Sequence, residues 1–240
     1  SGVWSSGGDL TTARFEAGGA GVENAGFIFG GRNPGYIATT EVYNGSSWSS
    51  GNDLLANSGY NQGVGTIYAA LSISGEPAAT SHELYDGSSW SEISNSPAEH
   101  GQGAATGTVN AANAMGHNYP ASSAGLEQWN GNVWTEGPIM ANNEVQHHSG
   151  AGLQNSTVIY GGINALDCTE HFDGSAWSAG GALNTGRRGV NGGAGGETHA
   201  MYAGGMTPTI VSATEHYDGS AWTSGGNLPA SIGGIQTLEI

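Results

Sequence analysis

Five residues in segments between expected strands have side chains suited to binding a sugar. Asn33 and Tyr36 stand in one such segment, and His117, Asn118 and Tyr119 stand in another. Aromatic rings stack on the apolar face of a sugar, and amide and imidazole groups form hydrogen bonds with its hydroxyls. We therefore predict a ligand-binding site at these five residues. The alternative is that they belong to ordinary solvated loops.

The histidines and acidic residues do not show the spacing of metal ligands. His147 and His148 are adjacent, and adjacent residues of a strand point to opposite faces, so the pair cannot bind one metal ion together. We predict no metal site and no cofactor. Asp9 and Asp53, in expected turns, leave Ca²⁺ binding as an alternative because carboxylate oxygens are its usual ligands.

A glutamate recurs at one equivalent position in five segments: Glu41, Glu83, Glu127, Glu170 and Glu215. Glycosidases use paired carboxylates, but a residue present in every segment is more simply a hydrogen-bond acceptor that links strands. Arg14 and Arg188 begin expected first strands, where we expect them to pair with carboxylates such as Glu16. We predict no catalytic residue and no enzyme activity.

These residues belong to a repeat that is marked by tryptophan. The tryptophans recur at intervals of 42 to 45 residues: Trp4, Trp48, Trp90, Trp134, Trp177 and Trp222. Five of them follow another aromatic residue by five positions: Tyr43, Tyr85, Trp129, Phe172 and Tyr217. An Asn-Gly or Asp-Gly pair stands between the two aromatics, which predicts a hairpin whose two central residues have positive φ.

Each repeat reads as four strands, and the first of them is rich in Gly and Ala. Small residues let strands crowd around a central axis. We predict an all-β propeller of five four-stranded antiparallel blades in one domain, 1–240, with repeats at about 11–49, 55–91, 98–135, 142–178 and 185–223.

The two ends carry spare strands, a fourth strand within 1–9 and a first strand within 231–240. Closure as six blades is less favoured because the sixth would lack its two middle strands. The spare strands could instead pair with another copy in a homo-oligomer or with a neighbouring domain.

An apolar strand ending in two glycines, then a Tyr, then a Trp, resembles the kelch repeat. The glycine pairs are Gly30-Gly31, Gly161-Gly162 and Gly204-Gly205. The resemblance implies a propeller in which the glycines and both aromatics are structural. The phrasing Glu-x-Tyr-Asp-Gly-Ser-Ser-Trp also resembles Gly-rich kelch-like repeats of marine tailed-phage structural proteins, which implies a location on a virion or outside the cell.

The charge balance excludes two classes of partner. Twenty acidic residues face four Arg and no Lys, a net charge of −16. Nucleic acids and anionic membranes need a basic surface, so we predict neither as a partner. No apolar run approaches the roughly 18–20 residues of a membrane span, so we predict no membrane insertion.

Together these patterns favour a non-enzymatic binding or structural propeller that recognises a glycan or a virion protein through its variable loops. One alternative is a galactose-oxidase-like copper enzyme, which would need Cys168 cross-linked to a Tyr, a second Tyr and two His. Another is a kelch adaptor that recruits proteins.

Overall fold

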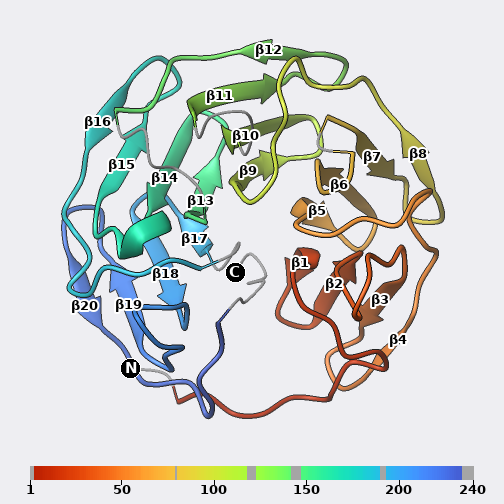
Figure 1. The fold of residues 1–240 in the computed structure, drawn as a ribbon, viewed down its shortest axis with the longest axis horizontal. Coiled ribbons are helices and arrows are strands. Elements are labelled where there is room, and N and C mark those ends of the chain that lie inside the picture. The colour runs from red at the N-terminus through yellow and green to blue at the C-terminus, as the bar shows by residue number, and fades with distance from the viewer. Residues whose placement is uncertain (1–2, 79, 118–122, 142–146, 190–192, 234–240) are drawn as a thin grey trace.

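The computed structural model describes residues 3–78, 80–117, 123–141, 147–189 and 193–233. The chain forms five four-stranded antiparallel sheets arranged as blades around a central axis (Figure 1). Each blade runs in chain order from its inner to its outer strand. The predicted all-β fold of five blades is confirmed.

The strands have the following bounds. Blade 1 contains β1 (Gly18–Val22), β2 (Ala25–Phe29), β3 (Thr40–Tyr43) and β4 (Trp48–Ser50). Blade 2 contains β5 (Gln62–Thr66), β6 (Ala69–Ile73), β7 (His82–Tyr85) and β8 (Trp90–Glu92). Blade 3 contains β9 (Ala104–Thr108), β10 (Ala111–His117), β11 (Ser123–Trp129) and β12 (Trp134–Glu136). Blade 4 contains β13 (Ser149–Leu153), β14 (Ser156–Tyr160), the short 3₁₀ turn η1 (Ile163–Ala165), β15 (Thr169–Phe172) and β16 (Trp177–Ala179). Blade 5 contains β17 (Gly193–Gly196), β18 (His199–Ala203), β19 (Thr214–Tyr217) and β20 (Trp222–Ser224).

The outer hairpin of each blade joins the third and fourth strands in the predicted register. The aromatic residue lies opposite the tryptophan, as in Tyr217↔Trp222, whose ring centroids are 4.9 Å apart. The predicted turn was wrong in one respect, because only its glycine, such as Gly219 with φ 95°, has positive φ. The Asp218 carboxylate accepts the N–H groups of Ser220 and Ala221 and so holds a four-residue loop in place of a two-residue turn.

Neighbouring blades pack face to face through apolar side chains. Phe27 and Phe29 of β2 are fully buried against Tyr85 and Trp90 of blade 2, with Phe27 stacked on Trp90 at 5.6 Å. The same arrangement joins blade 4 to blade 5, where the rings of Tyr160 and Trp222 form a T-shaped pair with centroids 4.7 Å apart. The repeat aromatics therefore form the interfaces between blades, and burial of such large rings is the main apolar contribution to the fold.

The inner strands of successive blades approach one another through their backbones. A Cβ on Gly63 of β5 would lie 2.1 Å from the carbonyl oxygen of Gly19 in β1. A Cβ on Gly193 of β17 would lie 2.3 Å from the carbonyl oxygen of Gly150 in β13. Glycine is therefore required at these positions by the close approach of two main chains.

The repeated glutamate tethers the loop that enters its own blade. Glu41 accepts the N–H groups of Thr11 and Thr12 at 2.7 and 3.0 Å and pairs with Arg14 at 2.6 Å, with both charged side chains buried. Glu215 holds Asn184, Thr185 and Arg187 in the same way. The expected partners of two arginines were wrong.

For the arginine of blade 5, the reason is a shift of one residue along the chain. Arg187, and not Arg188, is the counterpart of Arg14, while Glu16 pairs with Arg32 at 3.3 Å. Arg188 instead contacts the sulfur of Met206. Two adjacent arginines gave no sequence signal for which one would turn toward the glutamate.

The N-terminal end differs from the expected spare strand. Residues 3–10 contain no strand, although Trp4 keeps the spacing of the repeat. Within the expected first strand of 231–240, residues 231–233 also contain none, and 234–240 lie outside the described residues. Across the ranges that the structure describes, no helix is long and apolar enough to cross a membrane.

Candidate functional site

A set of four residues surrounds the axis where the loops enter the inner strands. Glu16, Tyr60, Gln102 and His147 each stand two residues before an inner strand and have φ of 55–59°. Backbone hydrogen bonds join them across blades, from Tyr60 N–H to Glu16 O at 2.6 Å and from His147 N–H to Gln102 O at 2.7 Å. We call these four residues the collar. Positive φ in such residues costs on the order of 1 kcal/mol each, and such strain clusters at ligand-binding positions.

The loop between β2 and β3 adds two side chains beside the collar. The guanidinium of Arg32 lies 5.2 Å from the ring centroid of Tyr36 and 3.3 Å from Glu16. The Tyr36 hydroxyl donates to Glu76 of the next blade at 2.6 Å. Glu16, Arg32, Tyr36, Tyr60 and Glu76 form what we call the loop-face cluster, and they come from two blades. Gln102 of a third blade approaches Glu76 at 3.4 Å and borders the cluster.

Both phenols in the loop-face cluster stay protonated at neutral pH. Burial, followed by its hydrogen bond to Glu16, raises the pKa of Tyr60 to about 12. The hydrogen bond to Glu76 is the main cause that raises the pKa of Tyr36. The cluster therefore presents hydroxyl and guanidinium donors beside carboxylate acceptors, on a partly exposed surface. This mixture suits a polyhydroxylated ligand.

The structure brings together only part of the predicted ligand site. Tyr36 lies in the loop-face cluster, and Asn33 is exposed in the same loop. His117 ends β10, and Asn118 and Tyr119 lie outside the described residues. The sequence analysis did not place Glu16, Arg32, Tyr60 or Glu76 in the ligand site, since their meeting depends on backbone conformations in two repeats. The available signal was the position two residues before the first strand, where the first four repeats each have a different large polar residue.

The residues considered for metal or copper chemistry have other contacts. Asp53 accepts the backbone N–H of Thr40 at 3.1 Å, and Asp9 is exposed. The Cys168 sulfur lies 3.9 Å from the carbonyl oxygen of Gly161. Among the side chains that the structure describes, no three His, Cys, Asp or Glu residues are grouped so as to hold a metal ion.

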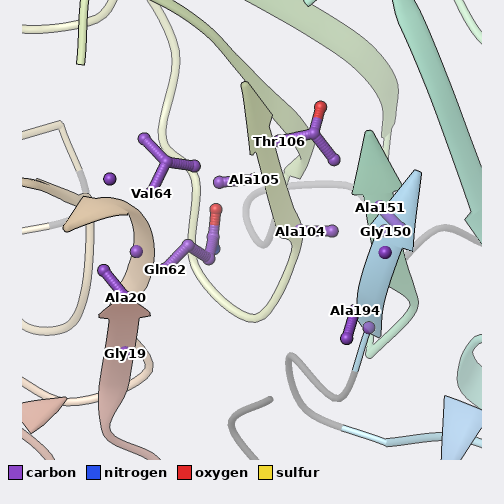
Figure 2. A pocket seen from close by; sticks show the side chains of 14 residues that line it. Gly19, Ala20, Gln62, Val64, Ala104, Ala105, Thr106, Gly150, Ala151 and Ala194 are labelled. Atoms are coloured by element: carbon purple, nitrogen blue, oxygen red, sulfur yellow. The ribbon is translucent and has the colours of Figure 1, made fainter. Parts of the chain in front are cut away.

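A small cavity lies on the axis between the inner strands (Figure 2). Its volume is about 40 Å³, and glycine and alanine form most of its wall. The space suffices for a few water molecules and is too small for a sugar ring. Gln62 lines it and is 1% exposed, and neither of its amide atoms has a hydrogen-bond partner within the described part of the chain.

Replacing Gln62 with Met is expected to lower the free energy of unfolding by about 1 kcal/mol, because we expect the buried amide to form hydrogen bonds with water in this cavity. Thermal or urea unfolding measures the change. A rise in stability would show instead that the amide is buried without partners, since its removal would then relieve a desolvation cost.

The fold defines the chain as a β-propeller. Among solved structures, that of YjhT superposes on it with a TM-score of 0.72, at 12% sequence identity, over 89% of this chain and 84% of the other. At this identity the likeness shows a shared fold alone. No protein-family model and no curated protein matches the sequence.

Proposed function

We propose that the protein is a non-enzymatic binding propeller that recognises a glycan through the loop-face cluster. The observation that carries the proposal is the pairing of Tyr36 with Glu76 and of Tyr60 with Glu16, both next to Arg32. Alternating donors and acceptors beside two tyrosine rings match the hydroxyls and apolar face of a sugar. The strained collar holds these groups in place before a ligand arrives, which reduces the cost of ordering them on binding.

The setting of the site supports a role in recognition. Loops on a rigid scaffold are where binding residues tend to stand, and here the loops between second and third strands meet those that enter the first strands, as in the bridge between Phe15 and Arg32. The kelch-like repeat and its likeness to phage structural proteins favour the surface of a virion, or another extracellular surface, as the location. Host glycans are accessible there.

Screening the protein on a glycan array, followed by calorimetric titration of any sugar that binds, tests the proposal. In Tyr36→Phe the hydroxyl is lost while the ring remains, and Glu76 loses the hydrogen bond from that hydroxyl. We expect at least roughly tenfold weaker binding, which corresponds to about 1.4 kcal/mol. Tyr60→Phe is expected to act in the same direction through Glu16.

The matched control is Tyr68→Phe. Tyr68 is 74% exposed in the turn between β5 and β6, at the opposite end of the strands from the loop-face cluster. Its replacement should leave sugar binding unchanged. If the intact protein binds no sugar on the array, glycan recognition is wrong. If it binds one that Tyr36→Phe and Tyr60→Phe do not weaken, the location of the site is wrong.

A further inference from the structure

The contact between blades 4 and 5 differs in chemistry from the earlier ones at one position of the repeat. There the middle residue of a third strand stands beside the turn between the first and second strands of the next blade. Between blades 4 and 5 the two residues are His171 and Glu197, which lie 3.1 Å apart. In the first three interfaces the same positions hold neutral residues: Val42 and Ile67, Leu84 and Val109, and Gln128 and Gln154.

Hydrogen bonds fix the direction in which His171 donates. Its Nδ1 lies 3.1 Å from Glu197, and its Nε2 lies 2.7 Å from the hydroxyl of Tyr217. The Gly181 N–H donates to the same hydroxyl at 3.4 Å. Tyr217 is buried, and within the described part of the chain Nε2 is the one acceptor that its proton reaches. Tyr217 therefore donates to Nε2, and the single imidazole proton of His171 stands on Nδ1, toward Glu197.

Glu197 receives these hydrogen bonds without a compensating charge. A neutral His171 donates to one of its oxygens, and Ser156 donates to the other. The chain has no lysine, three of its four arginines pair with other carboxylates, and the fourth contacts Met206. No lysine or arginine of this sequence thus neutralises Glu197. Its side chain is 27% exposed, so a cation from solution can reach it.

Glu197 lines an open groove between blades 4 and 5, at the end of the strands opposite to the loop-face cluster. The groove has a volume of about 380 Å³, and small-molecule sites span roughly 300–1,000 Å³. Thr198 and Ser220 also line it. The Ser220 hydroxyl donates its proton to Asp218, so toward a ligand its oxygen is an acceptor. The groove therefore offers mainly acceptors around one carboxylate.

The electrostatic field in the groove favours a cation. Burial is the main cause that raises the pKa of Tyr217, and the charges of Asp218 and Glu197 raise it further. Both carboxylates therefore act on the same buried hydroxyl, which lies at the wall of the groove. A negative potential in a concave site raises the local concentration of cations.

We propose that this groove is a binding site for a protonated primary amine, whose ammonium group forms an ion pair with Glu197. An ammonium group has three N–H donors and no acceptor, which matches a carboxylate beside hydroxyl oxygens. His171 and Ser156 are positioning residues that hold the two carboxylate oxygens in place. The amine belongs to an amino sugar or to a lysine side chain, and the experiment separates these two sources.

An NMR titration of the full chain tests the proposal. The probes are glucosamine and Nα-acetyl-lysine amide, and their neutral counterparts are N-acetylglucosamine and the same lysine compound acetylated at Nε. We expect the two ammonium compounds to shift the signals of the His171 ring and the Gly181 amide in a saturable way. The neutral compounds should leave these signals unchanged. The ammonium compound that binds more tightly identifies the source of the amine.

Glu197→Gln removes the charge and keeps an oxygen that accepts from His171, so we expect at least roughly tenfold weaker binding. The matched control is Glu23→Gln, which should not change binding. Glu23 holds the same turn position in blade 1, is exposed, and does not line the groove.

A double variant provides a second measurement. His171→Leu combined with Glu197→Val copies the neutral pair Leu84 and Val109. It should abolish amine binding and leave the melting temperature unchanged or higher, because an apolar pair replaces a polar one of similar volume. A double variant that is folded and still binds the amines would show that the groove is not the site.

Two further results would overturn the proposal. One is the absence of a saturable shift with both amines, or equal shifts with their neutral counterparts. The other is equal weakening by Glu197→Gln and Glu23→Gln, which would indicate general attraction to an acidic surface. Tyr36→Phe separates this site from the proposed glycan site, since it should weaken sugar binding and leave amine binding unchanged.

Discussion

Glu41→Gln is expected to lower the free energy of unfolding by about 3–5 kcal/mol, since it removes one member of a buried ion pair. Arg14 is fully buried, and its guanidinium also donates to the carbonyl oxygens of Gly30 and Thr39. Without the Glu41 carboxylate its charge would stay buried and unpaired. The N–H groups of Thr11 and Thr12 would also face an amide in place of a carboxylate. Urea unfolding should show the loss as a lower midpoint.

The control is Glu136→Gln, at an exposed residue of β12, which should change stability by no more than about 0.5 kcal/mol. Equal effects of the two substitutions would contradict the proposed role of Glu41. The pH dependence gives a further check. Burial acts to raise the pKa of Glu41, but the donors Thr11, Thr12 and Arg14 outweigh it and hold the pKa below its usual range. The stability from this carboxylate is therefore present above about pH 4.3, the usual pKa of an unfolded glutamate, and is lost as the pH falls further. Glu41→Gln should remove that part of the acid sensitivity.

Gly63→Ala should destabilise the protein by about 3 kcal/mol through overpacking. The new Cβ would lie 2.1 Å from the Gly19 carbonyl oxygen and 2.7 Å from the Phe29 ring, so β1 and β5 would have to separate. The φ angle of Gly63 is not in the left-handed region, and the cost arises from the contact alone. Thermal unfolding measures the effect.

Gly196→Ala provides the matched control, because a Cβ there would meet nothing within 4 Å. It lies at the end of an inner strand, as Gly63 lies within one. We expect a change within about 0.5 kcal/mol. If Gly63→Ala were equally mild, the inner strands would have room that the structure does not show.

Much of the fold could be predicted from the sequence because the same pattern of residues supports each prediction in all five repeats. The spacing from Tyr217 to Trp222 fixes which residues face each other in a hairpin, and the same spacing recurs in every blade. The turn conformation could not be predicted as well. An aspartate that accepts two backbone N–H groups stabilises a longer loop, and the dipeptide Asp-Gly is compatible with both forms.

The site was less accessible to sequence reasoning. Tyr36 is recognisable as a loop aromatic, but its partner Glu76 is 40 residues away in another repeat. The collar depends on positive φ at residues such as Tyr60, for which the sequence offers no glycine as a signal. The loop-face cluster thus arises from how blades sit beside one another, which the spacing of a repeat does not specify.

Among the residues that the structure describes, β17 and β1 make no contact comparable to that between the other neighbouring inner strands, and this affects how the molecule unfolds. Each of the three central blades packs on two neighbouring blades, whereas the described parts of blades 1 and 5 each pack fully on one. Where stability is roughly the sum of nearest-neighbour interfaces, such terminal units fray first. The protein is then expected to unfold progressively from blades 1 and 5 toward blade 3, as an open array of repeats does, and not as one closed unit.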